Sequence, residues 1–179
     1  MDDMAIFKAT YTTRSGGAKA SIRYIEHRPG KEGAKITRTL WGSDGKMERQ
    51  EAYRMIDEAE QGSLFYRFVI SPDPKQEDTD KDLFMREITE QTMQRLEDRF
   101  QKQLHWVAAS HDDHAPHRHV HILAVVPGRL QVPDFQLLRK TATEAALEQR
   151  KQLDLAREQN RGREGQREEG QEWERERSK

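Results

Sequence analysis

Histidines are concentrated in one short part of this chain. Six of the seven lie between residues 105 and 121, and His117, His119 and His121 occupy alternate positions of an apolar segment. Side chains of a β-strand point alternately to its two faces, so these three imidazoles would share one face. Imidazole nitrogens bind divalent transition metals and also carry protons in catalysis. The segment therefore predicts a metal site or a catalytic site.

The preceding segment adds a fourth histidine to this face. Residues 104–110 and 117–126 read as two strands joined by a short polar loop, as in an antiparallel hairpin. A suitable register brings His111 beside the row, and we predict a three-nitrogen metal site formed by His111, His119 and His121. An isolated pair of exposed histidines is usually just part of the polar surface. Six histidines between residues 105 and 121, by contrast, favour metal binding or catalysis. We interpret His105 as structural, and His114 and His117 as residues near the site, on the surface or in contact with substrate.

The rest of the sequence must position these side chains. Apolar alternation and turn residues predict strands over 4–11, 34–42 and 64–71, and amphipathic spacing predicts helices over 18–28, 47–60, 79–103 and 134–159. The sum is an α+β fold with a mainly antiparallel sheet of about five strands and helices packed on one face. We expect a core over 1–132, a C-terminal helix over 133–160, and a charged, frayed or disordered tail over 161–179.

Composition excludes several classes of protein. The chain has no cysteine, which removes disulfides, Cys-ligated zinc and thiol catalysis. Charged residues make up 35% and hydrophobic ones 34%, with a net charge of −1, so any basic surface must be local. No apolar run is long enough to span a bilayer, and the start lacks the basic flank of a signal peptide. We expect a cytoplasmic protein without membrane insertion.

Two motifs resemble those of the HUH endonucleases, specifically the relaxases of conjugation and plasmid mobilisation. "SHDDHAPHRHVHILAVV" is similar to their third motif, with His111 and Asp113 as its HxD and His119-Val120-His121 as its histidine pair. "ASIRYIEHRPG" is similar to their first motif and contains Tyr24. Relaxases carry the tyrosine before the histidine pair, unlike related replication initiators, and no tyrosine follows residue 66 here. The resemblance spans roughly residues 4–130.

The resemblance implies a mechanism. Tyr24 would attack a scissile phosphate of single-stranded DNA at a transfer origin, giving a 5′-phosphotyrosine and a free 3′-hydroxyl, and rejoining would reverse the step. A divalent metal, Mg²⁺ or Mn²⁺, would be held by His111, His119 and His121, although imidazoles also suit Zn²⁺ or Ni²⁺. Asp113 would act as base or orient His111, and Tyr11 is the fallback nucleophile. Relaxosome accessory proteins and a coupling protein are the expected partners.

Other features leave alternatives open. Basic residues of the first third could track a phosphate backbone: Arg23, Arg28, Lys31, Lys35 and Arg38. Trp41 could stack on a base or belong to the core. "HRHVHIL" is also like the strand of histidine-triad nucleotide hydrolases, although Arg118 interrupts that pattern. A non-catalytic metal-binding or DNA-binding accessory protein of a mobile element is the third reading.

Overall fold

The computed structural model describes residues 5–29, 33–112 and 117–177, with side-chain surroundings given as far as residue 165. Its centre is a six-stranded sheet in which every neighbouring pair is antiparallel. In spatial order the strands are β1 (Ile6–Thr12), β4 (Leu64–Ser71), β6 (His119–Val126), β5 (Trp106–His111), β2 (Trp41–Gly42) and β3 (Gly45–Lys46). The predicted α+β class is confirmed, with one short strand more than expected.

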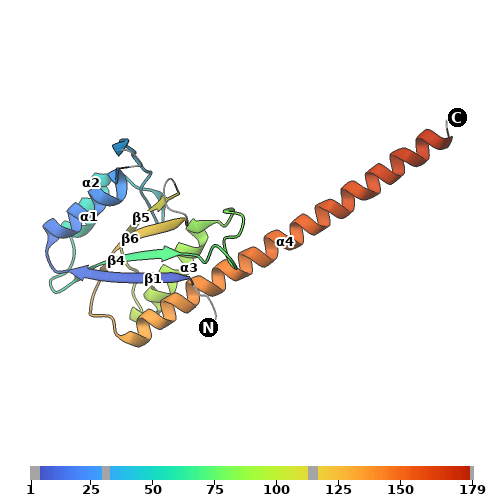
Figure 1. Ribbon diagram of the computed structural model, residues 1–179. Helices are drawn as coiled ribbons and strands as arrows, with labels where there is room; N and C mark the ends of the chain where they lie inside the picture. The colour runs from blue at the N-terminus through green and yellow to red at the C-terminus, as the bar shows by residue number, and fades with distance from the viewer. Residues whose placement is uncertain (1–4, 30–32, 113–116, 178–179) are drawn as a thin grey trace.

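Helices cover both faces of this sheet, as Figure 1 shows. α1 (Ser15–His27) and α2 (Arg49–Asp57) pack on one face, and α3 (Met85–Phe100) and α4 (Val132–Arg177) pack on the other. The expectation that helices lie on one face only was therefore wrong. The physical reason is visible in β6, where Leu123 and Val125 alternate with Ile122 and Ala124, so the strand is apolar on both sides.

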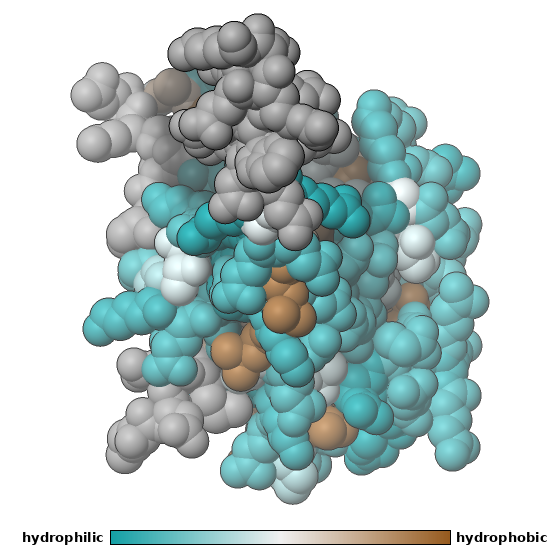
Figure 2. Space-filling model, turned by 90° about the vertical axis from the view of Figure 1, so that its right-hand side faces the viewer, coloured by the Kyte–Doolittle hydropathy of each residue, from teal (hydrophilic) through white to brown (hydrophobic). Residues whose placement is uncertain are grey.

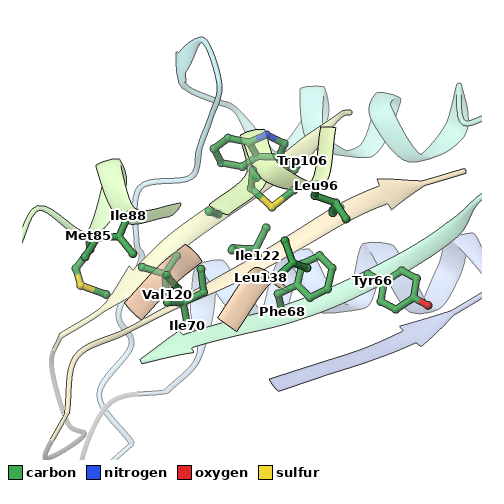
Figure 3. Close-up of a cluster of buried hydrophobic side chains, with 14 of the residues drawn as sticks. Tyr66, Phe68, Ile70, Met85, Ile88, Leu96, Trp106, Val120, Ile122 and Leu138 are labelled. Carbon is green, nitrogen blue, oxygen red and sulfur yellow. The ribbon is translucent and has the colours of Figure 1, made fainter. Parts of the chain in front are cut away.

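The larger core lies between the sheet and the α3–α4 layer. Alternate residues of the central strands point into it, including Phe68 of β4 and Ile122 of β6, and they meet Ile88 of α3 and Leu138 of α4 (Figure 3). Phe68 is 1% exposed and stacks on Tyr66 with ring centroids 5.5 Å apart. Trp41 also belongs to this core, where it contacts Trp106 edge to face, so it is not placed to stack on a base.

A smaller core fills the α1–α2 face, and it ends where the histidines begin. Ile22 and Ile25 of α1 pack on Leu123 and Val107, which lie on adjacent strands. α1 therefore lies across the same face that carries the odd-numbered residues of β5 and β6. This packing sets the position of α1 relative to the histidine row.

Residues 34–42 do not form the strand that their β-branched side chains predicted. Only Trp41 and Gly42 are paired in the sheet. The backbone N–H of Arg38 donates to the carbonyl of Glu26 at the end of α1 instead, so helix α1 holds this segment away from the sheet edge. This hydrogen bond also brings Arg38 to the C-terminal end of α1.

The third helix begins later than predicted, at Met85 rather than near residue 79. The preceding turn is held by ion pairs to residues far along the chain. Asp78, which is 4% exposed, binds Arg118 through both carboxylate oxygens and accepts from the backbone N–H of Leu83. Asp82 binds Arg150 of α4 at 2.6 Å. These contacts also explain Arg118 as a structural residue.

α4 is one continuous helix that leaves the body, as Figure 1 shows. Its 46 residues run through the boundary expected at residue 160 and through the segment expected to be frayed or disordered. Leu138, Ala142 and Ala146 are buried against the core, whereas every residue from 154 to 165 is exposed. The face in Figure 2 is largely hydrophilic, with only separate hydrophobic residues. None of the helices in the described ranges combines the length and apolar character needed to cross a membrane.

Two glycines weaken the projecting part of α4. A Cβ added at Gly162 or Gly165 would meet no atom within 4 Å, so alanine fits at both positions. Because glycine costs about 1 kcal/mol relative to alanine in a helix interior, we expect Gly162→Ala/Gly165→Ala to increase helicity and slow amide exchange over residues 154–165. Hydrogen exchange measured by mass spectrometry checks this. Unchanged exchange over that range, with the body as an internal control, would contradict the prediction.

Candidate metal centre

The register of the β5–β6 hairpin brings the predicted histidines together. His111 pairs with His119, and Ala109 pairs with His121, so all three histidines lie on the α1–α2 face. Ring centroids are 5.2 Å apart for His111 and His119, 4.4 Å for His111 and His121, and 5.0 Å for His119 and His121. Each ring offers a nitrogen that lies within 4.8 Å of the other two. The predicted trio is therefore one cluster.

Backbone carbonyls select which nitrogen two of the three rings present. Nε2 of His111 lies 2.9 Å from the carbonyl oxygen of Ile25, and Nδ1 of His119 lies 3.2 Å from that of His117. A carbonyl only accepts, so these nitrogens carry hydrogen and the opposite nitrogens hold lone pairs. Hydrogen bonds of this kind orient histidines that bind metals. Among the described residues, Nδ1 of His111 and Nε2 of His121 are buried without a hydrogen-bond partner. Buried nitrogens of this kind fit a role as metal ligands.

The surroundings favour the neutral form of the three imidazoles, the form that binds metals. Burial lowers the pKa of His111 to about 4 and that of His121 to about 3, and burial also lowers the pKa of His119. The positive charges of Arg28 and Arg38 add to the lowering at all three rings. A cluster of three nitrogen donors fits Mn²⁺, Zn²⁺ or Ni²⁺ better than Mg²⁺, which prefers oxygen.

Acid is expected to destabilise the metal-free protein. Histidine in the unfolded chain has a pKa near 6.5, above the values of about 4 for His111 and about 3 for His121 in the fold. The unfolded chain therefore binds more protons, and the free energy of unfolding falls as the pH falls below about 6.5. By linkage we expect a loss on the order of 1–2 kcal/mol per histidine at pH 5. Urea unfolding at pH 7 and pH 5 measures it.

The matched control for this pH effect is the double variant His111→Ala/His121→Ala. It lacks the two histidines whose pKa values are lowered to about 4 and about 3 and keeps only His119, so its loss of stability between pH 7 and pH 5 should be smaller. An equal loss in wild type and variant would assign the acid sensitivity to other groups.

Tyr24 stands beside this cluster. It lies in the last turns of α1, 51% exposed, with its ring edge-on to His121 at a centroid distance of 6.1 Å. The guanidinium of Arg28 lies 5.9 Å from the centre of the same ring. The next residue, Ile25, supplies the carbonyl that holds His111. The predicted nucleophile and the predicted ligands are thus juxtaposed through α1.

Tyr11, the fallback nucleophile, is not brought to the histidines. It projects from β1 on the opposite face of the sheet, with its ring 5.3 Å from that of Tyr66 in the larger core. Period-two alternation along β1 decides this, because Phe7 and Ala9 on the same side also pack on that core. Tyr11 therefore cannot attack a group bound at the histidines.

The remaining predicted residues fall into three groups. Arg28 and Arg38 lie near the histidines, as their effect on all three pKa values requires, and Arg38 also donates to the carbonyl of Arg28. Arg23, Lys35 and His105 are exposed without a contact to the cluster, and His117 contributes its carbonyl. Asp113, His114 and Lys31 lie outside the described residues.

Sequence reasoning missed the groove beside the cluster. Lys8 and Thr10 of β1 and Arg67 of β4 line it together with Tyr24 and His121. A signal was available: Lys8 and Thr10 alternate with Phe7 and Ala9, which assigns them to the face opposite the larger core. Arg67 interrupts the apolar run "LFYRFVIS". The order of the strands in the sheet decides which strands lie beside the histidines, and the spacing of residues in the sequence does not reveal that order.

Sequence comparison with protein families and curated proteins identifies no relative. No protein-family model matches the chain, and no curated protein matches it in sequence.

Proposed function

We propose that the protein is a metal-dependent DNA relaxase, which nicks single-stranded DNA at a transfer origin and rejoins it. The observation that carries the proposal is the convergence of three imidazoles, two of them with buried unpartnered nitrogens, next to an exposed tyrosine on α1. A divalent cation held by His111, His119 and His121 would polarise the scissile phosphate and neutralise developing charge.

The reaction assigns a defined task to the chain's own residues. The phenolic oxygen of Tyr24 attacks phosphorus, the bond from phosphorus to the 3′-oxygen breaks, and a 5′-phosphotyrosine forms. The phenolic proton passes to a base, for which Asp113 is the proposed residue, and the 3′-oxygen leaves as a hydroxyl after taking a proton from water. Arg28 and Arg38 contribute positive charge at the cluster, which favours a bound phosphate. Accessory proteins of a relaxosome and a coupling protein are the partners that this function entails.

The alternatives use fewer of these features. A histidine-triad hydrolase would use the row His117, His119 and His121, but the third ring of the observed cluster belongs to His111. Neither that reading nor a non-catalytic accessory protein gives a role to Tyr24.

The test is a denaturing gel of the full chain after incubation with Mn²⁺ and single-stranded oligonucleotides that span candidate transfer origins. We expect a covalent protein–DNA band that EDTA abolishes. Absence of an adduct with every origin would overturn the proposal. Release of nucleoside monophosphate from a phosphoramidate would then favour the hydrolase, and metal binding without either reaction would favour the accessory protein.

A further inference from the structure

A groove with a volume of about 600 Å³ lies between α1 and strands β1 and β4. α1 contributes residues from its first turn, Gly17, to its last turns, Tyr24 and Ile25. His121 forms part of the same wall. A ligand in the groove would therefore touch both the proposed nucleophile and one proposed metal ligand.

Small side chains on one side of α1 create the space. Gly17, Ala20 and Ser21 face β1 and β4, whereas Ala18 and Ile22 on the adjacent side of the helix pack into the smaller core. The wall is mostly apolar, with Val69 and Ile25 beside these small residues. A groove of this size and character is suited to a small organic group.

The charge of the groove has one sign. Lys8 and Arg67 line it, and no aspartate or glutamate is among its described lining residues. Within the described part of the chain, neither Lys8 nor Arg67 is in an ion pair. Lys19, by contrast, is on α1 outside the groove and is paired with Asp57 at 2.7 Å. In a chain with 32 acidic residues and a net charge of −1, this acid-free wall favours an anionic ligand.

We infer that this groove binds a nucleotide of the single strand next to the scissile phosphate, its base against the apolar wall and its phosphate at Lys8 and Arg67. The identity of the ligand as single-stranded DNA rests on the proposed function. A flat apolar group joined to an anion is what a nucleotide offers, and base contacts plus a basic track are the two means by which proteins hold single strands.

Fluorescence anisotropy tests the inference with the full chain and a labelled random-sequence 12-nucleotide single strand in EDTA, so that no metal-dependent cleavage intervenes. Lys8→Gln/Arg67→Gln should raise Kd by roughly tenfold or more and lower the salt slope by about 0.7 for each lost phosphate contact. Ala20→Phe, at an exposed position, should weaken binding by filling the groove while leaving the salt slope unchanged. Lys8→Arg, which keeps the positive charge, should bind with a Kd near the wild-type value.

The matched control is Arg95→Gln/Lys151→Gln, which removes two exposed cations from the α3–α4 layer and should leave Kd near the wild-type value. Three results would overturn the inference: groove variants that bind like wild type, equal affinity for duplex DNA, or no binding by wild type. The denaturing gel measures covalent adduct formation, which is a readout independent of DNA binding. Adduct formation that does not depend on Lys8 and Arg67 would reject the groove but keep the relaxase, whereas groove-dependent binding without any adduct would reject the relaxase chemistry.

Discussion

Replacement of Tyr24 by phenylalanine is expected to abolish the covalent protein–DNA adduct, a loss of roughly 10³-fold or more, because the substitution removes the attacking oxygen and nothing else. The ring keeps its edge-on contact with His121 and its contact with Arg28, since neither involves the hydroxyl. At 51% exposure the change should alter the free energy of unfolding by no more than about 0.5 kcal/mol. Quantified denaturing gels with Mn²⁺ measure the adduct.

Tyr11→Phe is the matched control for that experiment. Tyr11 is 43% exposed, similar to Tyr24, but it lies on the opposite face of the sheet. Its variant should form the adduct at the wild-type rate. An adduct that survives in Tyr24→Phe would show that another residue attacks, and the assignment of the nucleophile would fall.

Replacement of His121 by alanine should separate metal binding from stability. With one of three ligands gone, affinity for Mn²⁺ or Zn²⁺ should fall by more than about 100-fold, since even outer-sphere changes at metal sites cost 10–100-fold. The metal-free variant should lie within about 1 kcal/mol of wild type, because the side chain it loses carries a buried nitrogen without a partner among the described residues.

Calorimetric titration and thermal unfolding with and without metal measure both quantities. At a metal concentration 100 times Kd, the wild type gains about 2.7 kcal/mol, a rise in Tm of about 5–10 °C for a chain of this size, and the variant should gain almost nothing. His105→Ala, which removes an exposed histidine outside the cluster, should behave as wild type. Equal metal affinity in wild type and His121→Ala would contradict the proposed centre.

The histidine cluster was predictable because period-two alternation is a local rule. His119 and His121 share a face whatever the rest of the fold does, and a short loop leaves few registers for His111. The position of Tyr24 against His121 depended on how α1 crosses the sheet, which follows from the packing of Ile22 and Ile25 on residues far along the chain. Sequence spacing therefore predicted the histidine cluster, whereas the position of Tyr24 beside it depended on tertiary structure.

The errors have a common origin in long-range contacts. β-branched residues predicted a strand over 34–42, but the hydrogen bond from Arg38 to Glu26 holds that segment at α1. Apolar spacing predicted helix from residue 79, but ion pairs of Asp78 and Asp82 with distant arginines fix a turn there. The groove was not predicted, because its walls come from α1 and from three strands, β1, β4 and β6, that are neighbours only in the folded sheet order.

The hydrogen bond from His111 to the Ile25 carbonyl, 86 residues apart in sequence, joins the proposed metal centre to the helix that carries the proposed nucleophile. Because Ile25 follows Tyr24 directly, anything that fixes the His111 ring also restrains the last turn of α1. The restraint is reciprocal, since linked equilibria shift each other by the same free energy. Under the proposed function, cation binding at the histidines and order at Tyr24 would be thermodynamically coupled, and a strand attached to Tyr24 that pulls on α1 would also weaken cation binding.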